Sequence, residues 1–251
     1  MSKRGQIVIF LIMGVIIVGA AGLTFYLVKD STDKSTKDQI EQTQDISLLG
    51  GSVVEYVNSC LKQVGIEGGV FISEHGGYYE LPLNRDQDIA APYYMNQSVK
   101  SIITKDELER QLALYVEDQL FFCLKNFASF PALNIQQENT QAMVHVSSDT
   151  INIEVTLPLT IEQDVFVKSY SSFATKIPSS LGTLHDASTT FIDAEEQDSL
   201  CISCITTLAT DHGFRAVVSP VENNVILFSL IDEQSGLEYN FLSEYRFGGQ
   251  E

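Results

Sequence analysis

The chain has 251 residues, 44% of them hydrophobic, which is enough for one large domain or two small ones. Its formal charge is −18, and the part after residue 28 holds 13 lysine and arginine residues against 33 acids. Such a surplus of acids disfavours contact with nucleic-acid phosphates or anionic lipid head groups. We therefore predict no nucleic-acid partner.

Residues 7–28 form a run of 22 residues without a charged side chain. A helix of this length measures about 33 Å, and a bilayer core is about 30 Å thick. Lys3 and Arg4 precede the run, and no acid occurs before Asp30. We predict a single transmembrane helix over 6–28, with the N-terminus cytoplasmic and the bulk of the chain outside the cell membrane.

The cationic pair is followed directly by Gly5 and Gln6, and then by the apolar run. Lys3-Arg4-Gly5-Gln6 in this position resembles the class III signal of archaeal type IV pilin-like proteins. The resemblance implies a leader over 1–5, cut between Gly5 and Gln6 by a prepilin peptidase. It also implies that the helix over 6–28 forms a filament core by packing against copies of itself, so the chain is expected at the cell surface.

The sequence departs from the pilin pattern at Phe10, where many pilins carry an acid; this difference bears on polymerisation more than on processing. Two other interpretations of the N-terminus stay open. One is an uncleaved signal anchor, for which Lys3 and Arg4 only set the topology. The other is a conventional signal peptide cut after Ala21, although the apolar run exceeds a typical h-region of about 7–15 residues.

The similarity extends along the chain to a group of archaeal membrane-anchored proteins that are uncharacterised and share the KRGQ-type start. It implies an architecture and no activity. The features that carry it are Cys60 with Gly68-Gly69, Pro92-Tyr93-Tyr94, a helix ending at Cys123, and Tyr239-Asn240-Phe241.

The segment after the apolar run is polar over 29–45 and is expected to be a solvated stalk. Apolar residues then recur with helical spacing from Ile46 to Val64, and Gly65, Gly68 and Gly69 are predicted to end that helix. Residues 70–72 and 78–81 flank a glycine-containing turn, which predicts a short hairpin. Residues 82–103 are expected to be a loop.

A capping box of Thr104 and Glu107 predicts the start of a long amphipathic helix that extends to Phe127. Residues 142–147 and 151–159 are expected strands, the second with strict alternation, and 164–170 is its expected antiparallel neighbour. Pro158 indicates a sheet edge or a strand end.

The last third of the chain predicts helices over 179–194 and 198–212, followed by strands over 214–219, 224–231 and 237–247. Helices and strands come in blocks, so we predict an α+β fold: an extracytoplasmic domain of antiparallel sheets and amphipathic helices behind the transmembrane helix. We divide it into a helical region with a hairpin over 46–135 and an α+β region over 136–251.

The four cysteines fit an extracytoplasmic location, where disulfides persist. Cys60 and Cys123 each lie on an apolar helical face, and a bond between them would pin two long helices together. We favour the pairs Cys60–Cys123 and Cys201–Cys204 among the three possible connectivities. Four buried free thiols remain an alternative.

Cys201-Ile202-Ser203-Cys204 is the sharpest local motif, because thiols three residues apart at a helix start can become reactive. The preceding acids Glu195, Glu196 and Asp198 argue against reactivity, since they raise a thiol pKa. A zinc site would need two more ligands, and the nearest candidate is His212. A calcium site along 193–198 lacks the spacing of an EF-hand. We predict no catalytic residue, no metal and no cofactor.

Three functions follow as hypotheses. The first is a pilin-like, membrane-anchored surface protein that acts in assembly or adhesion without catalysis. The second is an extracytoplasmic thiol–disulfide oxidoreductase that uses Cys201 and Cys204. The third is a membrane-tethered binding module for an unknown ligand.

Overall fold

The computed structural model describes residues 50–246, apart from 87, 97–98, 197–198 and 223. The chain divides into two units, Met1–Ser52 and Val53–Glu251, and the second is described below. The predicted leader, transmembrane helix and polar stalk lie outside the described residues. Among the residues that are described, no helix combines the length and the apolar character needed to cross a membrane.

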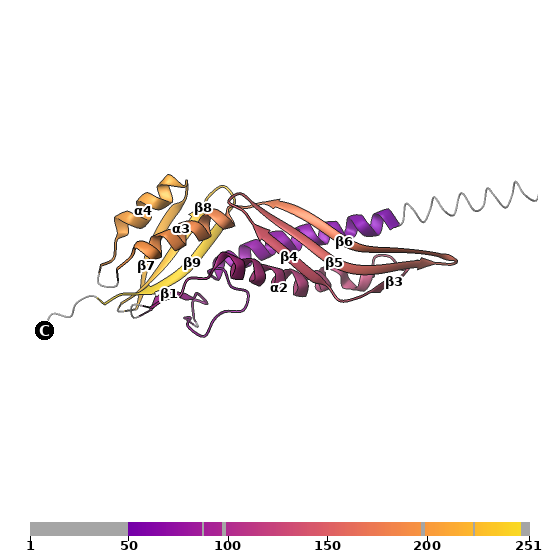
Figure 1. The fold of residues 1–251 in the computed structure, drawn as a ribbon, viewed down its shortest axis with the longest axis horizontal. Helices are drawn as coiled ribbons and strands as arrows, with labels where there is room; N and C mark the ends of the chain where they lie inside the picture. The colour runs from indigo at the N-terminus through magenta and orange to yellow at the C-terminus, as the bar shows by residue number, and fades with distance from the viewer. Residues whose placement is uncertain (1–49, 87, 97–98, 197–198, 223, 247–251) are drawn as a thin grey trace, which may run out of the picture. The chain divides into compact units, whose positions relative to one another are not determined.

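The second unit has an α+β fold with two sheets in which antiparallel pairs predominate, as the sequence predicts (Figure 1). A helix spans 50–74 within the described part, and its residues from 53 on belong to this unit. The other helices of the unit are Lys105–Leu124 (α2), Leu181–Ala194 (α3) and Ile202–Asp211 (α4), with a short 3-10 turn at Lys125–Phe127 (η1).

The first sheet has the strand order β2-β1-β9-β8-β7. Every neighbouring pair in it is antiparallel except β1 and β9, which run parallel. Its strands are β1 (Tyr93–Asn96), β2 (Val99–Lys100), β7 (Arg215–Glu222), β8 (Val225–Asp232) and β9 (Leu237–Glu244).

The second sheet is built around the long strand β5 (Thr150–Gln163). One edge of β5 pairs with β6 (Phe166–Pro178) along nearly its whole length. The other edge pairs first with β4 (Gln141–Val146) and then with β3 (Asn134–Gln137). The predicted antiparallel pairing of β5 with the strand that follows it, β6, is confirmed.

The alternation of β5 places one row of apolar side chains in the core. Each member of the row is at most 3% exposed: Ile151, Ile153, Val155, Leu157, Leu159 and Ile161. The helix over 50–74 lies against this row, because a side chain at Gly65 would meet Ile153 and one at Gly69 would meet Ile151. The row and the helix therefore form one core.

The expected helix end at Gly65, Gly68 and Gly69 is wrong. The helix continues to residue 74, with all three glycines inside it. At Gly65 an added Cβ would lie 2.5 Å from the Cδ1 atoms of both Ile153 and Ile177, and at Gly68 it would lie 2.7 Å from the ring of Tyr115. These glycines permit close packing on both sides, and that packing outweighs their cost of about 0.5–1 kcal/mol each in a helix.

The predicted hairpin over 70–81 is also wrong, and its turn ends a helix instead. Gly76 and Gly77 have positive φ angles, and the Gly77 N–H donates to the Ile72 carbonyl at 2.7 Å, which is a glycine C-cap. The segment that follows this turn is hydrogen-bonded to a side chain of α2. The buried Gln111 side chain accepts hydrogen bonds from the backbone N–H groups of Tyr79 and Glu80, at 2.9 and 2.8 Å.

Two further expectations need correction. The loop predicted over 82–103 contains β1 and β2, because Tyr93 and Met95 find parallel partners in β9, about 150 residues later. Pro158 lies inside β5, where the pairing with β6 shifts register between Thr156 and Leu159. Because a bulge breaks the ladder there, the missing N–H of proline is tolerated away from an edge or strand end.

The predicted helix cap and the last helices and strands are close to the sequence expectation. Thr104 accepts a hydrogen bond from the Glu107 N–H, at 3.3 Å, at the start of α2. Figure 1 shows α3 and α4 beside the sheet formed by β7, β8 and β9. Phe191 of α3 contacts Phe228 and Phe241 of that sheet, with ring centroids 4.9 and 6.4 Å away.

Candidate functional site

Two disulfide bonds are the chemically distinctive groups of the described chain. Cys60 and Cys123 join the helix over 50–74 to α2, with 63 residues of sequence separation. Cys201 and Cys204 close a loop at the start of α4 with a separation of three. These are the pairs that the sequence analysis favours, and no described cysteine is free.

The Cys60–Cys123 bond lies among packing contacts, and both of its cysteines also line a surface hollow of about 430 Å³. Cys60 is 4% exposed, and the neighbouring Tyr56 hydroxyl donates to the Cys123 carbonyl at 2.9 Å. The Tyr56 ring contacts Phe127 and Phe130 edge-on, with centroids 6.2 and 5.5 Å away. The bond thus joins two helices that already share a core, which is the environment of a structural disulfide.

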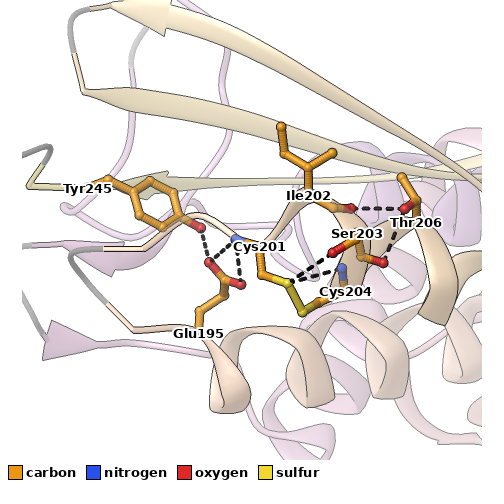
Figure 2. Close-up of a disulfide and its surroundings, with 7 residues drawn as sticks. All are labelled: Glu195, Cys201, Ile202, Ser203, Cys204, Thr206 and Tyr245. Carbon is orange, nitrogen blue, oxygen red and sulfur yellow. Dashed lines mark hydrogen bonds between the residues drawn. A yellow bond between two sulfur atoms is a disulfide. The ribbon is translucent and has the colours of Figure 1, made fainter.

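The Cys201–Cys204 bond has a different setting. Cys201 is the N-cap of α4, and its sulfur accepts the Cys204 N–H at 3.2 Å (Figure 2). The same sulfur lies 3.5 Å from the Ser203 hydroxyl oxygen. Cys204 and Ser203 are exposed and Ile202 is 52% exposed, so this bond lies at the surface.

A buried carboxyl group lies beside Cys201. Glu195 follows the end of α3 and is 5% exposed. Figure 2 shows its carboxylate between the Tyr245 ring and the Cys201 backbone: it accepts the Tyr245 O–H at 2.7 Å and the Cys201 N–H at 3.3 Å. The carboxyl group thereby fixes the backbone of the first cysteine of the motif.

The pKa of Glu195 is raised above its ordinary value, chiefly because burial disfavours the charged form. The hydrogen bonds from Tyr245 and from the Cys201 N–H, and the charge of Lys100, act in the opposite direction. Burial also raises the pKa of Tyr245 far above 10, and its hydrogen bond to Glu195 adds to this shift. Tyr245 therefore acts as a neutral O–H donor.

In the sequence, Glu195 stands out only as one acid in a run that argues against thiol reactivity, and no pattern points to Tyr245. Their contact spans 50 positions of sequence. A buried glutamate at the end of a helix has no periodic signature that separates it from exposed neighbours such as Glu196. The five-residue cluster of Glu195, Cys201, Ser203, Cys204 and Tyr245 is called the α4 disulfide site below.

The proposed zinc ligand does not join this site. His212 lies at the C-terminal end of α4, where its Nδ1 is 3.0 Å from the Leu208 carbonyl oxygen. Within the described residues, no group of three histidine, cysteine or acidic side chains is placed to hold a metal. Asp198, part of the calcium alternative, lies outside the described residues, as do Gly5 and Gln6 of the predicted leader cleavage.

A surface hollow of about 760 Å³ lies elsewhere, between the end of α2 and the residues that connect β3 and β4. Neither disulfide lines it. Its wall carries the acidic side chains of Glu117, Asp118 and Glu138, but Glu117 is already engaged, because it accepts the Ala142 N–H at 2.7 Å.

Comparison of the chain with protein-family models, with curated proteins and with solved structures finds no match.

Proposed function

We propose that the chain is a pilin-like, membrane-anchored surface protein whose outer domain acts in assembly or adhesion. The apolar run over 7–28 and the start at Lys3-Arg4-Gly5-Gln6 support the anchor and its processing. The cell membrane, a prepilin peptidase and further copies of the chain are the partners in this proposal. Catalysis has no part in it.

The observation that carries the proposal is the covalent attachment of the first described helix. The helix over 50–74 follows the apolar and polar segments in the sequence, so a pull on the anchor enters the domain through it. Cys60 ties this helix to Cys123 of α2, and beyond Cys60 the helix is packed through Gly65 and Gly68. The helix cannot detach past residue 60 unless a covalent bond breaks.

Such a clamp suits a protein that bears load or packs against copies of itself. If the helix over 50–74 detached from the domain, the apolar row of β5 that it covers would be exposed. A closed loop of about 60 residues also constrains the unfolded chain strongly, by about 4 kcal/mol. The domain should therefore stay folded when it is tethered at one end.

The test is expression of the full chain in one host with and without a prepilin peptidase, followed by intact-mass measurement and N-terminal sequencing of the membrane fraction. We expect an N-terminus at Gln6 only when the peptidase is present. We also expect the processed chain alone to form assemblies that sediment after detergent extraction.

A matched control replaces Gly5 with valine, whose branched side chain should block the cut; this variant should keep Met1 or Ser2 and stay unassembled. Retention of the leader in the natural chain with active peptidase would refute the pilin assignment. A membrane-tethered binding module would then be the surviving role. Thiol–disulfide exchange, the other alternative, concerns a different part of the chain and is compatible with either role.

A further inference from the structure

We propose that the Cys201–Cys204 bond is an exchangeable disulfide that takes two electrons from a protein dithiol, with Glu195 as the positioning residue that links the exchange to a proton. The juxtaposition behind this proposal is an exposed disulfide at a helix N-terminus whose first cysteine is held by a buried carboxyl group. The proposal goes beyond assembly or adhesion and does not depend on it.

Access is the first requirement of thiol–disulfide exchange, since a thiolate must approach one sulfur along the S–S bond. Cys204 is exposed, and so are the two residues between the cysteines. Ile202, 52% exposed, offers an apolar contact next to the sulfurs for the side chains around an incoming cysteine. In the other disulfide, Cys60 is 4% exposed and Cys123 is half-buried at the wall of a surface hollow, so neither cysteine is as exposed as Cys204.

The second requirement is a good leaving group, and the geometry assigns that role to Cys201. Its sulfur already accepts the Cys204 N–H at 3.2 Å, and it caps a helix of 10 residues. Both features stabilise negative charge at this sulfur. The incoming thiolate therefore bonds to the Cys204 sulfur, the Cys201–Cys204 bond breaks, and Cys201 leaves as the thiolate.

The second step completes the transfer of two electrons. The second thiol of the partner loses its proton and attacks the partner's own sulfur in the mixed disulfide. The bond to Cys204 breaks and Cys204 leaves as a thiolate that takes up a proton. The partner dithiol is oxidised to a disulfide while Cys201 and Cys204 are reduced. The reverse sequence reduces a partner disulfide and re-forms the Cys201–Cys204 bond.

The charge of Glu195 shifts the equilibrium between the disulfide and the dithiol forms of Cys201 and Cys204. An ionised carboxylate beside Cys201 opposes a thiolate there, whereas a protonated carboxyl group does not. The other groups that face Glu195 are the neutral Tyr245 hydroxyl, the Cys201 N–H and the cation of Lys100, all of which favour its ionised form. Because a thiolate at Cys201 repels the carboxylate, formation of the thiolate should raise the pKa of Glu195 and draw a proton onto it.

The test uses the purified full chain equilibrated in buffers of reduced and oxidised dithiothreitol, followed by alkylation and peptide mass spectrometry. The Cys201–Cys204 bond should be reduced at least about 10-fold faster than the Cys60–Cys123 bond, because Cys204 is exposed, whereas Cys60 is buried and Cys123 is half-buried. The variant Glu195→Gln should shift the reduction equilibrium of the pair toward the dithiol by about 3- to 10-fold at neutral pH, equivalent to roughly half to one pKa unit.

Glu196→Gln is the matched control, because it removes the same charge from the adjacent, exposed residue. It should leave the reduction equilibrium unchanged. If the two variants behave alike, or if both disulfides are reduced together in the natural chain, the proposal is overturned. The second comparison needs no variant and so does not depend on the folding of Glu195→Gln.

The variants Cys204→Ser and Cys201→Ser test the assignment of the leaving group. The pKa of the remaining thiol, measured from the pH dependence of its alkylation rate, should be lower for Cys201 than for Cys204. In the Cys204→Ser background, Glu195→Gln should lower the pKa of Cys201 further. A higher pKa for Cys201 than for Cys204 would contradict the assigned direction of attack.

Discussion

The two disulfides of this chain are bonds of the same kind in contrasting structural environments. Cys60–Cys123 spans 63 positions, joins two long helices and includes a cysteine that is 4% exposed. Cys201–Cys204 spans three positions, lies at the surface and has a carboxyl group hydrogen-bonded to its backbone.

The difference shows that loop length and surroundings decide what a disulfide contributes. In the chain-entropy model, closing a loop of about 60 residues constrains the unfolded state by about 4 kcal/mol, and closing one of three residues by about 1.5 kcal/mol. The first bond therefore stabilises the fold. The second contributes little to stability, so it can open and close with small consequences for the rest of the domain.

The largest effect should follow from removing the first bond. The double variant Cys60→Ala and Cys123→Ala should lose about 4 kcal/mol of unfolding free energy, because its unfolded chain regains the entropy of the long loop. Urea denaturation followed by circular dichroism measures this loss. The matched double variant Cys201→Ala and Cys204→Ala should lose no more than about 1.5 kcal/mol of unfolding free energy. Equal losses in the two double variants would show that the two disulfides contribute equally to stability.

A smaller loss of unfolding free energy should follow from adding a side chain where the helix over 50–74 packs closely against β5. The variant Gly65→Val should lose about 1–3 kcal/mol, since its side chain must displace Ile153 and Ile177, whose Cδ1 atoms lie 2.5 Å from the position of the new Cβ. Urea denaturation again provides the measurement.

The control for this substitution lies in the same helix. Gly51 has no atom within 4 Å of an added Cβ, so Gly51→Ala should gain about 0.5–1 kcal/mol from the lower conformational freedom of the unfolded chain. A Gly65→Val variant as stable as the natural protein would show that the helix and the sheet do not pack as closely as described.

The smallest and most pH-dependent effect should come from Tyr245→Phe at the α4 disulfide site. The pKa of Glu195 is raised in the folded state, so the domain is favoured at low pH and loses stability as pH rises above about 4.5 and the buried carboxyl group ionises. Loss of the tyrosine O–H should raise this pKa further and cost about 1–3 kcal/mol at neutral pH.

Urea denaturation between pH 4 and pH 8 measures this effect, and the cost should shrink toward pH 4, as the carboxyl group becomes protonated in both states. Tyr79→Phe is the control, because it also removes a hydroxyl that donates to a carboxylate, Asp118, at 2.9 Å, but at an exposed site. Its cost should stay below about 1 kcal/mol. A cost for Tyr245→Phe that does not vary with pH would contradict the assigned role of Glu195.

Features that depend on local pattern could be predicted from the sequence. The alternation along 151–159 predicted a strand with one buried face, and Thr104 with Glu107 predicted the start of α2. The CxxC motif was placed near the start of a helix, where Cys201 indeed caps α4. In each case the signal lies within one element, because helix and strand periods and capping hydrogen bonds involve residues close in sequence.

Features that depend on distant partners could not be predicted. Gly65 and Gly68 act as helix breakers in isolation, yet Ile153, Ile177 and Tyr115 pack against them and keep the helix intact to residue 74. Burial separates Glu195 from the neighbouring acids, and its hydrogen-bond partner Tyr245 lies 50 positions later.

The sequence by itself determined the α+β class, most of the helices and strands, and the apolar segment over 7–28, because periodicity, capping and hydrophobic length are local properties. The tertiary structure alone decided that β1 pairs parallel to β9, that three glycines lie inside a helix, and that one disulfide is clamped in a core while the other meets a buried carboxyl group. These features require residues far apart in sequence to meet, and the free energy of burial that brings them together is a property of the whole packed domain.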